Sequence, residues 1–144
     1  MIEKTLFIIK PDGWSERAKI LDDISKQFNI VHTEVFDFSP DLTAKFYFND
    51  IGKPYYSAIE EYMVETPCQL GIIEGNTVIE NFFQFAGKLS DPKDCAVDTL
   101  RYKYGKGLDT TTSGLYIVKN AVHRAKSKEE YNYEKELLKL HNIL

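Results

Sequence analysis

The chain has 144 residues, of which 43% are hydrophobic and 13% aromatic, so it can bury an ordinary core and is not a disordered protein. Its 18 Lys and Arg residues stand against 22 Asp and Glu residues, and this acidic balance excludes a dedicated nucleic-acid binder. Length alone predicts one domain over residues 1–144. Cys68 and Cys95 have no metal-ligand spacing, and neither a signal-peptide core nor a membrane-length apolar run occurs. We therefore expect a cytoplasmic protein that does not contact a membrane.

The first part of the chain alternates strand and helix patterns. Residues 5–9 form a short apolar run that ends in a Lys-Pro-Asp-Gly turn, and residues 20–28 repeat apolar side chains at helical spacing. Residues 30–38 are rich in β-branched and aromatic side chains, which predicts a second strand. Ser39 is suited to cap a helix over residues 40–48, because proline follows at its first position.

The middle of the chain continues the alternation. Apolar side chains at helical spacing over residues 55–63 predict a further amphipathic helix. Residues 69–74 then form a compact apolar strand, which is followed by a helix over residues 77–86 that ends at Gly87.

The last part contains a long segment without a clear pattern, residues 88–114. Loops of this length are uncommon in compact domains unless they are functional or mobile. Residues 115–118 form the fourth predicted strand, and residues 128–140 form a charged amphipathic helix. The element order β-α-β-(α-α)-β-α-β-α predicts an α+β fold. This fold is the ferredoxin-like split βαβ sandwich, with helices on one face of a four-stranded antiparallel sheet.

Three side chains are candidates for phosphate chemistry. His123 lies between Lys119 and Arg124, and a histidine beside cations can be a nucleophile toward an anionic group; otherwise it is a surface or structural histidine. Lys10 ends the first strand, where it can act as a point charge for phosphate or simply solubilise the strand end. Arg101 can grip phosphate with two hydrogen bonds or form a surface ion pair.

Tyr47 and Tyr55 can line a slot for a flat ring, although aromatic residues at helical spacing more often belong to the core. The chain has no P-loop, kinase glycine loop or dinucleotide-binding fingerprint. Any nucleotide must therefore be held in another way.

Several motifs occur together, in order, over residues 3–140. Taken as a set they resemble the nucleoside diphosphate kinase family, and the most specific match is the strand and turn at residues 5–13. The others are Tyr47, Lys53-Pro54-Tyr55-Tyr56 with Tyr62-Met63, Glu74-Gly75, Asp91-Pro92, Thr99-Leu100-Arg101 and Asn120-Ala121-Val122-His123.

The resemblance implies that the γ-phosphoryl group of ATP passes to a nucleoside diphosphate through a phosphohistidine on His123, with ping-pong kinetics. It also implies a Mg²⁺ ion that bridges the β- and γ-phosphates. Lys10 and Arg101 match phosphate-binding positions, and Ser90 stands where the family has a phosphate-contacting threonine. The remaining substrate-binding positions are Tyr47 beside the transferred group, Tyr55 stacking the base, Ile59 and Ile117 as apolar walls, and Asn120 at the ribose.

A glutamate on the last helix is implied as the partner that orients the His123 ring. Counting from His123 gives Glu134, whereas the local Glu-Lys-Glu-Leu pattern gives Glu136. We expect Glu136, because the connection into this helix looks lengthened.

The chain departs from the family at three places. Arg124-Ala125-Lys126 replaces the usual Gly-Ser-Asp after the histidine, and an arginine expected before Gly87 is replaced by Phe83 or Gln84. Either Arg124 or Lys126 supplies the phosphate contact that this arginine makes in the family, or the contact is lost. Residues 105–114 look like an insertion beside the active site.

These departures leave two alternatives open. One is a weak or inactive nucleotide-binding or scaffold protein of the same fold, and the other is a ferredoxin-like sensor of a small ligand. The resemblance also implies a homo-oligomer, a tetramer or hexamer built from dimers.

Overall fold

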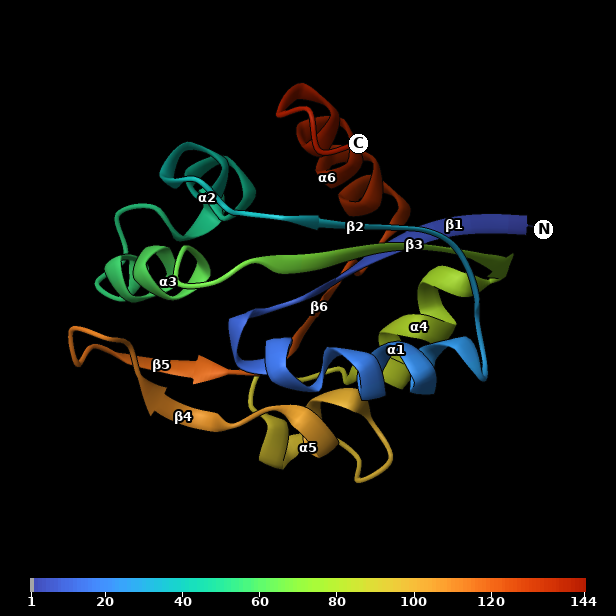
Figure 1. Ribbon diagram of the computed structural model, residues 1–144, viewed down its shortest axis with the longest axis horizontal. Helices are drawn as coiled ribbons and strands as arrows, with labels where there is room; N and C mark the ends of the chain where they lie inside the picture. The colour runs from blue at the N-terminus through green and yellow to red at the C-terminus, as the bar shows by residue number, and fades with distance from the viewer. Residues whose placement is uncertain (1) are drawn as a thin grey trace.

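The computed structural model describes residues 2–144 and contains a four-stranded antiparallel sheet. Its strands follow the order β2-β3-β1-β6, so the first strand of the chain is central (Figure 1). They are β1 (Ile2–Ile9), β2 (Asn29–Phe36), β3 (Cys68–Asn76) and β6 (Val122–Arg124). The expected α+β fold of the ferredoxin-like type is confirmed.

One face of the sheet is covered by α1 (Arg17–Ser25) and α4 (Val78–Ala86), with the short α5 (Leu100–Tyr104) beside them (Figure 1). Alternation along β1 points Phe7 and Ile9 into this core. Gly71 of β3 lies opposite Phe7, and a Cβ there would come within 2.0 Å of the Phe7 ring. The absent side chain therefore lets the aromatic ring lie flat on the neighbouring strand.

The other face is covered as well, by α2 (Pro40–Phe46), α3 (Tyr56–Met63) and α6 (Lys128–Leu140). Leu6 and Ile8 point into this second core. The expectation that helices cover only one face was wrong, because β1 and β3 are apolar on both sides and both sides must be buried. Ser39 caps α2 as predicted, accepting a hydrogen bond from the Leu42 N–H at 3.0 Å, but α2 ends two residues before the expected Phe48.

Residues 116–119 are a strand, but they do not belong to the main sheet. They form β5 (Tyr116–Lys119), which pairs with β4 (Gly107–Thr110) in a separate antiparallel hairpin. The fourth strand of the sheet is instead β6, whose three residues are too few to show a strand pattern in the sequence. Ala121 separates the two strands with a left-handed φ of 66°.

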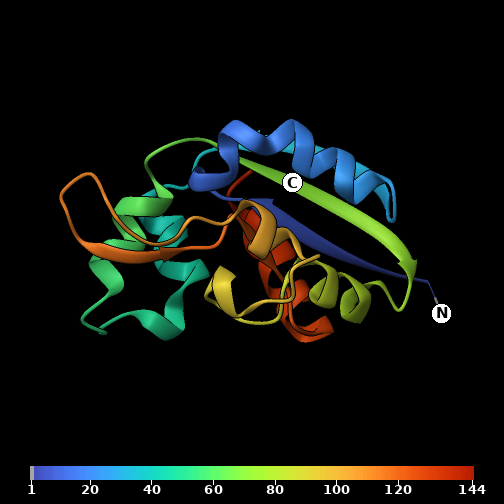
Figure 2. The ribbon, with the colours of Figure 1, turned by 90° about the horizontal axis from the view of Figure 1, so that it is seen from below.

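The segment 88–114, for which the sequence predicted no elements, contains three of them, η3 (Pro92–Asp94), α5 and β4. Two further 3₁₀ helices are η1 (Pro11–Glu16), directly after β1, and η2 (Phe48–Asp50), between α2 and α3. The β4–β5 hairpin lies beside α3, at the end of the molecule opposite residue 2 (Figures 1 and 2). Within residues 2–144, no helix combines the length and apolar character that crossing a membrane requires.

Candidate functional site

A cavity of about 480 Å³ lies between α3, the β4–β5 hairpin and the end of β1. It brings together seven of the predicted substrate-binding residues, although they come from distant parts of the chain. These are Lys10, Tyr47, Tyr55, Ile59, Ser90, Ile117 and Asn120. The sequence interpretation did not single out the other lining residues as binding residues, namely Asp50, Tyr62, Met63, Leu108, Tyr116 and Val118. His123 and Arg101 do not line this cavity. Arg101 donates a hydrogen bond to Leu89 O, beside the lining residue Ser90, and His123 follows the lining residue Asn120 by three positions.

The outer end of the cavity is aromatic and exposed. Tyr55 is 49% exposed and donates a hydrogen bond to Asp50 Oδ1 at 2.7 Å, which raises the pKa of the tyrosine. Tyr116 is 74% exposed, and Leu108 of the neighbouring strand is also exposed. No sequence signal pointed to these two hairpin residues, because their position depends on how the inserted hairpin folds back.

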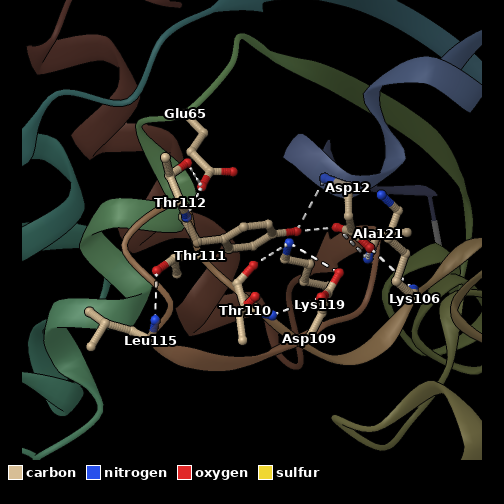
Figure 3. A network of polar contacts seen from close by, with 11 residues as sticks. Asp12, Glu65, Lys106, Asp109, Thr110, Thr111, Thr112, Leu115, Lys119 and Ala121 are labelled. Carbon is tan, nitrogen blue, oxygen red and sulfur yellow. Dashed lines mark hydrogen bonds and ion pairs between the residues drawn. The ribbon is translucent and has the colours of Figure 1, made fainter.

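Hydrogen bonds at the tip of the hairpin fix it to α3 and to Glu65 in the turn that follows α3. The N–H and hydroxyl of Thr112 donate to Glu65 Oε1 at 3.1 and 2.9 Å (Figure 3). The Ser113 N–H donates to Glu61 at 3.1 Å, and its hydroxyl donates to the same carboxylate. The Ser113 hydroxyl is the main cause that lowers the pKa of Glu61. Lys119 closes the base of the hairpin by donating to Thr110 O at 2.9 Å.

Asp12 is a buried carboxylate that joins four parts of the site (Figure 3). It lies in η1 and accepts hydrogen bonds from the Ala121 N–H at 3.1 Å, the Lys106 N–H at 3.4 Å and the Tyr62 hydroxyl. Burial and the nearby Asp12 charge raise the pKa of Tyr62, which keeps it a neutral donor. The Lys-Pro-Asp-Gly turn was the available signal for Asp12, but its binding partners lie too far along the chain to be read from sequence.

Lys10 is held at the inner end of the cavity. Its backbone N–H donates to Ala121 O at 2.7 Å, and its ammonium donates to Asn120 Oδ1 at 2.9 Å. Burial, followed by repulsion from Arg101, lowers the pKa of Lys10 to about 7. A lysine in this state gains free energy from any anion that enters beside it.

Arg101 and Asn120 hold the loop that follows α4. Asn120 Nδ2 donates to Ser90 O at 3.0 Å, while Arg101 Nη1 donates to Leu89 O at 2.9 Å. Arg101 also donates through Nε to Val122 O at 3.1 Å, which connects α5 to the start of β6. Its guanidinium is buried, and burial lowers its pKa to about 10.

His123 lies on β6 opposite Ile8, so its ring points into the core shared with α2 and α6. Its Nε2 is 2.9 Å from Glu134 Oε1, and the Glu134 side chain is buried. The edge of the Phe46 ring supports the imidazole, with the ring centroids 5.0 Å apart. His123 Nδ1 has no hydrogen-bond partner among the residues described, 2–144.

The choice of Glu136 as the histidine partner was wrong. Its side chain is 64% exposed and forms an ion pair with Lys139 at 3.5 Å. With about 3.6 residues per helical turn, residues two apart point to nearly opposite sides of α6. Only Ala125 and Lys126 lie between the end of β6 and Ser127, which caps α6, and the residue given by the direct count, Glu134, is the one that contacts His123.

The polar inner end, the aromatic outer end and a carboxylate-bound histidine suit the binding of a phosphorylated planar ligand. Comparison with known proteins agrees with this reading, since the family model for nucleoside diphosphate kinase matches residues 3–140. The chain belongs to the nucleoside diphosphate kinase family. It is therefore a phosphotransferase that moves the terminal phosphoryl group of a nucleoside triphosphate to a nucleoside diphosphate.

Individual relatives cover almost the whole chain. The nucleoside diphosphate kinase of Aquifex aeolicus is 30% identical over 138 residues, covering 92% of this chain and 91% of the relative. That of Pyrococcus furiosus is 32% identical over 137 residues, covering 92% and 80%. A crystal structure of the Aquifex aeolicus enzyme superposes with a TM-score of 0.79 at 28% identity, covering 96% of this chain and 95% of that one.

Proposed function

We propose that this family member works by a ping-pong mechanism with His123 as the nucleophile. One observation carries the proposal: His123 Nε2 is bound to buried Glu134, while Nδ1 has no partner among residues 2–144. A carboxylate on Nε2 keeps the proton on that nitrogen and leaves the Nδ1 lone pair available.

In the first half-reaction, the Nδ1 lone pair attacks the γ-phosphorus of ATP and forms a P–N bond. The bond from phosphorus to the β,γ-bridging oxygen breaks, and the nucleoside diphosphate leaves with that electron pair. The second half-reaction reverses these bond changes with a different nucleoside diphosphate. Glu134 stabilises the positive charge that the imidazole gains during attack, as a carboxylate does for a catalytic histidine.

The cavity supplies the remaining roles. Lys10 and Arg101 stabilise the charge that spreads over the phosphoryl oxygens in the transition state, and Ser90 donates its hydroxyl to the phosphates. Tyr47 stands beside the transferred group, and Asn120 contacts the ribose. Tyr55 stacks on the base between the side chains of Ile59 and Ile117, and such stacking accepts any base.

The charges around the cavity suit a Mg²⁺ ion that arrives with the nucleotide. Among residues 2–144, Asp50 is the single carboxylate that lines the cavity, and it already accepts the Tyr55 hydroxyl. The described residues that line the cavity thus offer no carboxylate cage, so phosphates and water would hold the ion there, as is usual for Mg²⁺ in such sites. When bound, the ion would neutralise charge between the β- and γ-phosphates.

We further propose that residues 1–144 form a single domain that assembles as a homo-oligomer, a tetramer or hexamer built from dimers, in the cytoplasm. The resemblance over residues 3–140 supports the assembly, and the two buried free thiols, Cys68 and Cys95, suit a reducing compartment.

The test is a labelling experiment with γ-labelled ATP and Mg²⁺. We expect acid-labile, alkali-stable label on the wild-type protein, and we expect a chase with GDP to remove it. His123→Ala should form no label, whereas the control His141→Ala should label normally, because His141 pairs with Asp41 on the surface. Failure of the wild type to become labelled would leave the scaffold alternative. Label that resists the chase would indicate a stalled phosphohistidine protein.

A further inference from the structure

Arg124 follows His123 on β6, and its side chain points to the opposite face of the sheet, into the side that α4 covers. The side chain is 5% exposed. Its Nε donates to Gly87 O at 3.0 Å and its Nη2 donates to Lys88 O at 2.8 Å. The guanidinium also lies over the ring of Phe83, 4.5 Å from the ring centroid. Lys126, the other residue that was expected to supply a cation here, is exposed.

Lys10, Arg101 and Arg124 are all buried, yet none of them forms an ion pair within residues 2–144. Their charges repel each other, since Arg124 and Arg101 both contribute to the lowered pKa of Lys10. Burying a cation without a carboxylate costs free energy. Three such cations in one region indicate a site whose counter-charge comes from a ligand.

The cations are arranged in a row along the loop that follows α4. Four consecutive carbonyl groups accept hydrogen bonds from the site, beginning at residue 87. Arg124 takes the first two, Arg101 the third and Asn120 the fourth. Because Asn120 also binds the Lys10 ammonium, the order in space is Arg124, Arg101, Asn120, Lys10. An extended anion such as a polyphosphate chain matches this row.

Both arginines keep donors that no protein group uses within residues 2–144. A guanidinium has five N–H groups, and the carbonyl contacts use two on each arginine. Arg101 Nη2 and Arg124 Nη1 have no hydrogen-bond partner in residues 2–144. In this range, the fully buried side-chain nitrogen and oxygen atoms that lack a hydrogen-bond partner are Thr5 Oγ1 and Tyr56 Oη. Neither arginine nitrogen is among them. These two nitrogens are therefore at least partly accessible to solvent.

We propose that Arg124 binds the phosphate chain of the nucleoside di- or triphosphate as a second guanidinium beside Arg101. This inference rests on the proposed function and specifies how its phosphate site is completed. Arg124 extends from β6 to the same loop that Arg101 binds, and its guanidinium lies over the Phe83 ring of α4. The contribution expected from an arginine on α4 is thus supplied from the strand that carries His123.

The test compares ligands with and without phosphate. Arg124→Gln should weaken ADP binding by about 10- to 100-fold, the size expected for lost hydrogen bonds to a charged group, and should leave adenosine binding within about twofold. Isothermal titration calorimetry measures both. Lys126→Gln, which removes the exposed cation two residues away, should change neither affinity. Unchanged ADP binding in Arg124→Gln overturns the proposal, and so does an equal loss for ADP and adenosine, which would make Arg124 a loop anchor.

A second measurement uses the wild-type protein in case Arg124→Gln does not fold. The arginine Nε–H signals in ¹H–¹⁵N NMR spectra should shift for both Arg101 and Arg124 on addition of ADP, and for neither on addition of adenosine. A shift of Arg101 alone overturns the proposal. Failure of the proposal for Arg124 can be distinguished from failure of the proposed function. If the wild type binds no ADP and forms no phosphohistidine, both the proposed function and the role of Arg124 are wrong. If the wild type binds ADP and forms phosphohistidine but the Arg124 Nε–H signal does not shift, only the role of Arg124 is wrong.

Discussion

The two ends of the cavity are built differently. At the inner end, Lys10 and Asn120 are less than a tenth exposed and are fixed by the ends of sheet strands. At the outer end, Tyr55 and Tyr116 are 49% and 74% exposed and belong to a helix start and an inserted hairpin. Phosphoryl transfer needs alignment within a rigid frame, whereas stacking on a base does not. In the proposed mechanism, the residues for phosphoryl transfer therefore lie at the ends of sheet strands, whereas those for base stacking lie at the start of α3 and on the hairpin.

The electrostatics of the two ends differ in the same way. At the inner end, Lys10, Arg101 and Arg124 are buried without an ion pair to a carboxylate within residues 2–144, and burial lowers the pKa of Lys10. At the outer end, the charged groups of the hairpin and α3 form ordinary surface hydrogen bonds. Substitutions at the inner end should thus change phosphoryl transfer and phosphate binding strongly, while those at the outer end should change nucleotide affinity modestly. The predictions below test this difference, starting with the largest expected effect.

Glu134→Gln should slow phosphorylation of His123 by about 10- to 100-fold, since it replaces a charge-assisted hydrogen bond by a neutral one. Rapid-quench labelling with γ-labelled ATP measures the rate. Glu136→Gln is the matched control on the same helix and should react at the wild-type rate, because its side chain faces solvent. The reverse ranking of the two variants would show that the observed Glu134 contact is not the one used in the reaction.

Lys10 should make ADP binding depend on pH. Its pKa is about 7 in the free protein and rises when a phosphate lies beside it, so binding above pH 7 requires uptake of a proton. Affinity for ADP should therefore fall as pH rises from 7.5 to 9, by up to about tenfold per pH unit. Calorimetry in buffers of different ionisation enthalpy should detect the proton. Lys10→Met should bind weakly and lose this slope, and a slope that persists in the variant would assign the proton to another group.

The sequence predicted which residues lie near the inner end better than it predicted the contacts between them. Lys10 and His123 could be picked out because each ends or follows an apolar run; Lys10 lines the cavity, and His123 is bound to buried Glu134. The prediction of Glu136 as the partner of His123 was wrong, since Glu134 and Glu136 differ only in which side of α6 they occupy. That side depends on where the helix begins, which is at the cap formed by Ser127.

Asp12 and the hairpin show a second limit of prediction from the sequence, which is that contacts between distant residues leave no local pattern. Asp12 bonds to residues 50 to 109 positions away, so no local pattern identifies its role. Residues 116–119 have the composition of a sheet strand, and only tertiary pairing with residues 107–110 places them in the hairpin. Local propensity predicted a strand correctly here, but it could not determine which sheet the strand joins.

Tyr55→Ala and Tyr116→Ala should each weaken ADP binding by about fivefold, the lower part of the range for base stacking, because both rings are exposed. Inhibition by inorganic pyrophosphate, which lacks a base, should not change in either variant. Competition assays with the two ligands separate these effects. A loss of pyrophosphate binding would mean that the outer end also shapes the phosphate site, which would contradict the division between the two ends.

The smallest effect is expected where the hairpin is fixed to α3. Glu65→Gln and Glu61→Gln weaken the acceptors for Thr112 and Ser113, so the hairpin should open more often while the inner end stays intact. The KM for ADP should rise about two- to threefold, as expected for exposed interactions worth up to about 1 kcal/mol, with kcat unchanged. Hydrogen exchange over residues 111–114 should become faster in both variants. Glu60→Gln, on the same helix, should leave exchange and KM as they are. A fall in kcat in the Glu61 or Glu65 variants would instead mean that the hairpin holds the reacting groups, since it shares Lys119 and the Asp12 contact at Lys106 with the inner end.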